Sequence, residues 1–136
     1  MTSPVPAGAF GVAALALVVS AAAAGLAAPL GGDPKNGAVI YERCVACHAL
    51  AYDRTGPRHC GLFGRRAGSV PGFAYSASMK RSGIVWTEQS LDRFLTSPLT
   101  FVPGTAMGYA GIADGKERAD LIAYLKHANA SPPCAK

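Results

Sequence analysis

The chain has 136 residues, of which 50% are hydrophobic and 15% are charged, and its formal net charge is +5. This length suits one small domain, and the composition excludes a disordered chain. The mild positive charge, without any run of Lys or Arg, favours docking on acidic partner surfaces and argues against nucleic-acid binding.

Much of the apolar character lies near the N-terminus. Residues 9–28 form an alanine-rich apolar stretch that ends in small residues, and no charged side chain occurs before Asp33. This pattern predicts a secretory signal peptide over residues 1–28. The segment before it, MTSPVPAG, lacks Lys and Arg, so an uncleaved anchor is the alternative, since about 20 apolar residues can span a bilayer. Either reading predicts export, to the periplasm, of a domain over residues 33–130.

Helical signals begin where the apolar stretch ends. Asp33 followed by Pro34 is a good N-cap with proline at the first helical position. One helical face then carries Gly37, Ile40, Tyr41, Cys44 and Val45. Residues 49–72 hold many glycines and prolines and no period, which predicts a long irregular loop.

Three further helical segments are predicted. Residues 74–81 suit a short helix that ends at Gly83, and Thr87 caps a helix that Pro98 ends. Residues 98–112 read as a second long loop. Asp114 with Glu117 starts a last helix with the apolar stripe Leu121, Tyr124, Leu125 and Ala128, and residues 131–136 form a tail.

No strand pattern competes, so the predicted fold class is all-α, with three to five helices. Two structureless loops of this length are unusual in so small a domain. They are reasonable if they wrap a large apolar cofactor that replaces part of the core.

The sequence Cys44-Val-Ala-Cys47-His48 is a C-x-x-C-H motif. Two thiols at this spacing can add to the two vinyl groups of one haem, and the adjacent histidine can then ligate the iron. A zinc site completed by His59 and Cys60 is the alternative, but adjacent residues chelate one tetrahedral ion poorly. A thioredoxin-like redox pair lacks the βαβ pattern that would accompany it.

A six-coordinate haem iron needs a second axial ligand, and four side chains are candidates: Met79, Met107, His59 and His127. Met107 lies in the loop segment PGTAMG, which can reach over the far face of the haem. Met79 lies in a short helical turn, where filling an apolar gap is the more common role. His127 is near the end of the last helix, and His59 lies too near the proximal side. Met107 is therefore the predicted ligand, and His59 is expected to be an ordinary loop residue.

From Gly37 to Leu125 the chain resembles the class I c-type cytochromes, that is, mitochondrial-type cytochrome c and its bacterial relatives. The segments that carry the resemblance are CVACH, TGPRHCGLFGRRAGSVPGFAYS, GIVWTEQSL, PGTAMGYAGI and ERADLIAYLK. It implies the class I cytochrome c fold and one covalent haem c. Cys44 and Cys47 would carry the thioethers, and His48 and Met107 would ligate the iron.

The resemblance also implies roles for residues around the haem. The Pro57 carbonyl would accept the ring N–H of His48. The haem propionates would contact one permanent cation and two side-chain donors, namely Arg65, Tyr75 and Trp86. Thr105 would lie beside the ligand loop, and Gly37 would meet Tyr124 where the first and last helices cross.

Two departures from the family pattern concern the haem pocket. Phe94 stands where the mitochondrial proteins have a tyrosine whose hydroxyl reaches the methionine sulfur, and Met79 stands at a position that is often asparagine.

The implied function is that of a monomeric electron carrier between membrane or periplasmic donors and acceptors, not an enzyme. The partner patch would be the exposed haem edge, which residues such as Arg43, Arg54, Lys80 and Tyr109 would surround. A haem enzyme or gas sensor with a dissociable Met107 is the alternative.

Two cysteines remain once the motif is assigned. Cys60 and Cys134 are an even remainder in an oxidising compartment, which predicts a disulfide between the tail and the first long loop. The resemblance supports the pairing in part, because the last helix ends on the side of the molecule where this loop runs. Two free thiols are the alternative.

Overall fold

The computed structural model describes residues 1–4 and 31–135. The predicted signal peptide or anchor falls almost entirely on residues 5–30 and so lies outside the described residues. Within the described ranges, no helix has the length and apolar character needed to cross a membrane.

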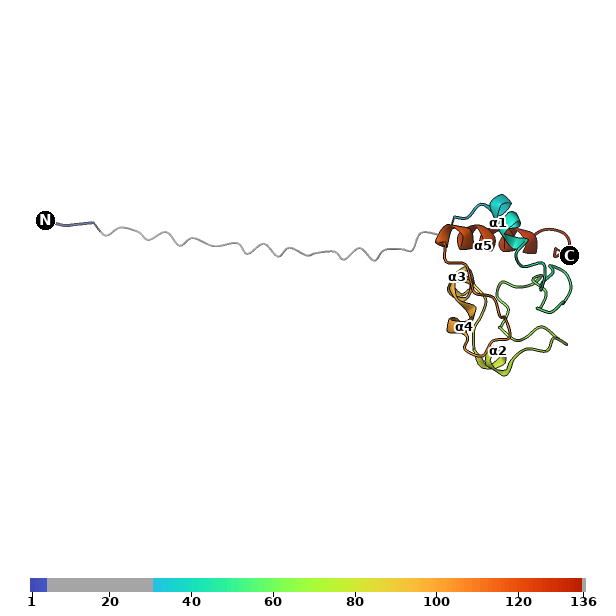
Figure 1. Cartoon of the computed structure of the whole chain (residues 1–136). Coiled ribbons are helices and arrows are strands. Elements are labelled where there is room, and N and C mark those ends of the chain that lie inside the picture. The colour runs from blue at the N-terminus through green and yellow to red at the C-terminus, as the bar shows by residue number, and fades with distance from the viewer. Residues whose placement is uncertain (5–30, 136) are drawn as a thin grey trace.

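The described residues form five helices and no strand (Figure 1). The helices are α1 (Pro34–Tyr41), α2 (Ala77–Arg81), α3 (Glu88–Thr96), α4 (Pro98–Phe101) and α5 (Gly115–Asn129). The only β pairing in the same ranges is one isolated antiparallel bridge between Arg66 and Val85. The all-α prediction with three to five helices is therefore confirmed.

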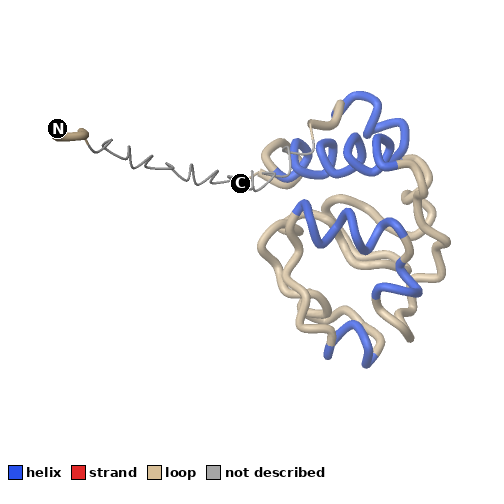
Figure 2. Tube along the Cα trace, turned by 90° about the vertical axis from the view of Figure 1, so that its left-hand side faces the viewer, coloured by secondary structure: helices blue, strands red, loops and turns tan. Residues whose placement is uncertain are grey.

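Helices α1 and α5 lie side by side at one end of the domain in both views (Figures 1 and 2). Asp33 caps α1 by accepting the Lys35 N–H at 2.9 Å, and Asp114 caps α5 by accepting the Glu117 N–H at 2.8 Å. The Glu117 carboxylate binds Arg43 rather than completing a capping box. Both predicted helix starts are thus confirmed, and the second is capped from one side only.

Gly37 lies at the crossing of these two helices. A Cβ atom on Gly37 would overlap the backbone carbonyl of Asp120 and would lie 2.7 Å from Cβ of Tyr124. The close approach that the resemblance implied for Gly37 and Tyr124 is therefore present, and it requires glycine.

The variant Gly37→Ala should destabilise the domain by about 3 kcal/mol, because the added methyl group forces apart two helix backbones that cannot yield like a flexible side chain. Chemical denaturation of the holoprotein measures this change. Gly115→Ala is the matched control, since its Cβ would meet only the end of Arg118 at 3.5 Å. Equal stability of both variants would show that the crossing tolerates a side chain.

A buried carboxylate joins the same two helices. Asp120 of α5 is 1% exposed and accepts three hydrogen bonds of 2.7 Å, from the Asp33 backbone N–H, from Asn36 Nδ2 and from Lys116 Nζ. The Lys116 hydrogen bond, followed by those of Asn36 and Asp33, lowers the pKa of Asp120 to about 2. The start of α1 is therefore held to α5 by an ionised group.

This depressed pKa predicts an acid-dependent loss of stability. The contribution of Asp120 is complete above its ordinary pKa of 3.8 and disappears as the pH falls through about 2. The variant Asp120→Asn should therefore show a flatter dependence of the free energy of unfolding on pH between 4 and 2. The pH dependence of Lys116→Gln should lie between those of Asp120→Asn and the wild type, because this variant removes the largest cause of the lowered Asp120 pKa. Parallel pH profiles for all three proteins would contradict this role.

Helix α3 packs against α5 and contributes to the central core. Thr87 and Ser90 form a reciprocal capping box at its start, and Leu91, Phe94 and Leu95 are buried. The prediction of a loop over residues 98–112 is wrong at its beginning, where Pro98–Phe101 form the short helix α4. Proline at the first position of a helix loses no hydrogen bond, so Pro98 ends one helix and begins the next.

The opposite end of the domain consists of α2 and long loops (Figure 2). Two backbone hydrogen bonds flank the isolated bridge between Arg66 and Val85. The Ala67 N–H donates to the Ile84 carbonyl at 2.8 Å, and the Trp86 N–H donates to the Arg65 carbonyl at 2.9 Å. These bonds give the first long loop a fixed place without forming a sheet.

The structure joins the tail to this loop through Cys60 and Cys134, whose Cα atoms are 5.0 Å apart. Beside this bond, Asn129 of α5 accepts the backbone N–H groups of Gly61 and Leu62 at 2.7 and 3.2 Å. The tail is therefore part of the domain rather than an appendage.

Candidate functional site

The C-x-x-C-H motif follows α1 in a series of turns. The Cys44 carbonyl accepts the backbone N–H of Cys47 at 3.0 Å and that of His48 at 2.8 Å, which holds both thiols and the imidazole in one compact unit. Cys44 is partly buried, Cys47 is exposed, and neither forms a disulfide. Burial raises the pKa of the Cys44 thiol to about 11, so it remains protonated at neutral pH.

His48 is buried with one ring nitrogen engaged. Its Nδ1 lies 2.8 Å from the Pro57 carbonyl oxygen, and because a carbonyl can only accept, Nδ1 carries the proton. Burial lowers the pKa of His48, which favours the neutral ring and leaves the Nε2 lone pair free for a metal. A Cβ on Gly56 would lie 2.6 Å from Nε2 and 2.7 Å from Nδ1, so the backbone packs tightly against this ring.

His59 lies against His48 instead of in an exposed loop. The two rings stack with centroids 4.3 Å apart and 20° between their planes, and the Tyr41 hydroxyl lies 3.0 Å from His59 Nδ1. Burial, followed by the nearby His48 and Arg65, lowers the pKa of His59 to about 3. The expectation of an ordinary loop residue is therefore wrong. No periodicity in the loop signalled the contact, because it depends on how two segments meet.

The zinc alternative has no site in the part of the chain that the structure describes. Cys60 is bonded to Cys134, and the described residues contain no group of three or more His, Cys, Asp or Glu side chains placed to hold a metal ion. Among the described residues, the motif therefore offers two thiols and one imidazole, without further ligands for zinc.

Arg65 is a half-buried cation whose Nε is fully buried. Its two terminal nitrogens donate to the carbonyls of Cys60 and Arg58 at 3.0 and 2.9 Å, whereas its Nε has no hydrogen-bond partner among the described residues. Burial lowers the pKa of this guanidinium. An orphaned buried donor on a cation suits an anionic group, such as a haem propionate.

The two other predicted propionate contacts lie in the same region. Trp86 is buried and its backbone is bonded to that of Arg65. Tyr75 is partly buried, and burial raises the pKa of its hydroxyl while the charge of Arg65 lowers it. Tyr75 is thus close enough to Arg65 to be influenced by its charge, and Trp86 is joined to Arg65 through the backbone.

The loop that carries Met107 is fixed at both ends. Thr105 donates its backbone N–H to the Val102 carbonyl at 3.0 Å and accepts the Met107 N–H on its hydroxyl at 3.2 Å. The Ile112 N–H bonds the Leu95 carbonyl of α3 at 2.8 Å. Met107 is partly buried against the core, so its thioether faces apolar surroundings.

Two of the other candidate ligands, Met79 and His127, lie in different surroundings from Met107. Met79 of α2 is buried in the hydrophobic core, and His127 is exposed near the end of α5. Phe94 is buried between two aromatic rings, with centroid distances of 5.1 Å to Trp86 and 6.4 Å to Phe101. No hydroxyl is available at this position.

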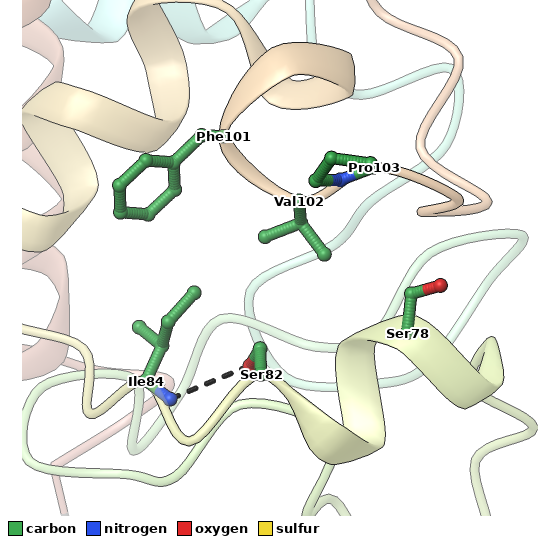
Figure 3. Close-up of a pocket in the computed structure, with 6 residues that line it drawn as sticks. All are labelled: Ser78, Ser82, Ile84, Phe101, Val102 and Pro103. Atoms are coloured by element: carbon green, nitrogen blue, oxygen red, sulfur yellow. Dashed lines mark hydrogen bonds between the residues drawn. The ribbon is translucent and has the colours of Figure 1, made fainter.

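Figure 3 shows a cavity of about 330 Å³ between α2 and the segment that follows α4. Its lining is formed by Ser78, Ser82, Ile84, Phe101, Val102 and Pro103. The side chains of Ile84 and Phe101 point toward the space from opposite walls. None of the predicted site residues lines it, although Ile84 lies two positions before Trp86 in the chain, and Pro103 two positions before Thr105.

Two thiols at C-x-x-C spacing, a neutral imidazole and a guanidinium whose buried Nε has no partner define a protein that attaches haem covalently within an all-helical domain. Comparison with known proteins agrees. The family model for cytochrome c matches residues 34–129. The chain is 41% identical over 124 residues to cytochrome c2 of Blastochloris viridis, which covers 89% of this chain and 92% of that protein.

A cytochrome c of Euglena viridis is 45% identical over 98 residues, covering 70% of this chain and 96% of the relative. Among solved structures, cytochrome cH from Methylobacterium extorquens aligns with a TM-score of 0.69 and 39% identity, over 71% of this chain and 99% of that one. The chain belongs to the cytochrome c family. Its cofactor is accordingly one covalently bound haem c, and its function class is electron carrier rather than enzyme.

Proposed function

We propose that this protein is a single-haem electron carrier in which His48 and Met107 are the axial ligands and Cys44 and Cys47 carry the thioethers. The observation that carries the proposal is the state of His48. Its Nδ1–H donates to the Pro57 carbonyl, which raises the basicity of the ring and leaves Nε2 as the nitrogen that would bind the iron.

The remaining haem contacts follow from the same region. The unpartnered Nε of Arg65 would hold a haem propionate, and Tyr75 and Trp86 would supply further donors at the polar end of the pocket. Thr105 holds the backbone of the Met107 loop, and Phe94 supplies apolar packing. The proposed pocket therefore combines a cation that would neutralise a propionate with apolar packing around the haem.

When bound, the haem exchanges one electron between its ferric and ferrous states. A thioether ligand and an apolar environment both stabilise the ferrous state and raise the reduction potential. With both axial positions taken by protein side chains, the site suits electron transfer and not the binding of a substrate.

The carrier works outside the cytoplasm, in the periplasm, between membrane or periplasmic redox partners. The export signal of residues 1–28 and the disulfide of Cys60 with Cys134 support this compartment. Arg54 and Lys80 offer exposed positive charge for acidic partners, whereas Arg43 is held by Glu117 at 2.7 and 2.9 Å and contributes less.

Three measurements on the purified holoprotein test the proposal. Its ferric form should show the sulfur-to-iron charge-transfer band at neutral pH, and its ferrous form should bind carbon monoxide slowly. Washed membranes should reduce and reoxidise it when respiratory donors and acceptors are supplied. Rapid carbon monoxide binding by the wild-type protein would overturn the carrier assignment, and N-terminal sequencing decides between a cleaved leader and an anchor.

A further inference from the structure

The axial histidine of this chain has a neighbour that the haem-attachment chemistry does not require. The ring of His59 stacks on that of His48, with centroids 4.3 Å apart and planes 20° from parallel. Aromatic rings in this range attract one another with a preferred geometry. Rotation of one ring about its own axis would change the overlap with the other.

His59 is itself held from both its backbone and its side chain. Its N–H lies 3.1 Å from the carbonyls of Ala49 and Leu50, and the next residue, Cys60, donates to Leu50 at 2.7 Å. These partners directly follow His48 in the chain. The loop that carries His59 is therefore tied to the segment that carries the ligand.

The side chain of His59 is held by Tyr41. The Tyr41 hydroxyl lies 3.0 Å from Nδ1, and the two rings also meet edge to face at 5.7 Å. Tyr41 is 4% exposed and packs on Tyr124 of α5 with ring centroids 5.1 Å apart. The support of His59 thus reaches the crossing of α1 and α5.

We propose that His59 is a positioning residue, which, held by Tyr41, sets the rotation of the His48 ring about the bond from Nε2 to the iron. The Pro57 carbonyl holds one edge of that ring and the Gly56 backbone packs against it, while the stacked His59 ring restrains its plane. The inference rests on the proposed function, in which His48 is an axial ligand.

The ring plane has a direct spectroscopic signature. In a low-spin ferric haem, an axial imidazole plane determines which of two iron orbitals carries the unpaired electron. This choice sets the g-values in electron paramagnetic resonance and the order of the haem methyl shifts in proton NMR. A residue that only stabilises the fold would leave both unchanged.

The test compares four variants of the ferric holoprotein. His59→Leu removes both the stacked ring and the hydrogen bond, and we expect shifted g-values and a changed order of haem methyl resonances. His59→Phe retains a planar ring and should remain closer to the wild type. Tyr41→Phe removes only the hydrogen bond and should shift the spectra in the same direction by a smaller amount. His127→Leu is the matched control at an exposed position and should be silent.

Wild-type g-values and methyl order in His59→Leu would overturn the proposal. If His59→Leu does not retain haem, Tyr41→Phe decides, and spectra identical to the wild type would then overturn it. The proposed function fails in a different way: it is contradicted if the wild-type protein lacks the sulfur-to-iron band. Failure of the positioning role leaves that band intact.

Discussion

The variant Met107→Ala should lose the ferric sulfur-to-iron charge-transfer band and should bind carbon monoxide rapidly in the ferrous state. Its reduction potential should fall by roughly 0.2 V, a fraction of the range of about 0.8 V that axial ligands cover. The reason is that, in the proposed function, the Met107 thioether would stabilise ferrous iron and occupy the sixth position. Absorption spectra, redox titration and carbon monoxide kinetics measure the three effects.

Met79→Leu is the matched control for this experiment. Met79 of α2 is buried in the core, and exchange of Met for Leu conserves volume at a cost below about 1.5 kcal/mol. The charge-transfer band should persist in this variant. If the band disappears in Met79→Leu and persists in Met107→Ala, the two methionines have been assigned the wrong way round.

Removal of the bond between Cys60 and Cys134 should lower the free energy of unfolding by on the order of 4 kcal/mol. The two residues are 74 positions apart, so the bond closes a long loop and strongly restricts the unfolded chain. In Cys134→Ala the tail and the loop beside Asn129 should become the first regions to exchange amide hydrogens. Chemical denaturation gives the stability, and hydrogen exchange gives its location.

A double-variant cycle separates a cross-link from two independent thiols. Cys60→Ala, Cys134→Ala and the combined variant should be equally destabilised, because either single change already removes the bond. Thiol counting on the denatured holoprotein should find no thiol before reduction and two after it. Additive small effects, with two thiols titrating before reduction, would refute the disulfide.

Local signals accounted for most of the helices. Asp33 with Pro34, Thr87, and Asp114 each marked a helix start that the structure contains, because capping is a matter of adjacent residues. Helix α4 was missed, since Pro98 reads equally as the end of one helix and the first residue of another.

The haem-attachment residues were predictable for a related reason. In the C-x-x-C-H motif the spacing itself carries the chemistry, so the residue order is enough to propose Cys44, Cys47 and His48. By contrast, the stacking of His59 on His48 joins two segments of an irregular loop. Neither hydrophobic period nor motif spacing records such a contact.

The sequence alone therefore determined the family, the covalent cofactor and the helical class, because these follow from short motifs and local capping. Only the tertiary structure decided how the site is completed. It buries Nε of Arg65 without a partner, closes the helix crossing on Gly37, and sets His59 and Tyr41 beside His48. Each of these depends on the packing of residues far apart in the chain, where distance and burial, and not residue type, determine what a side chain does.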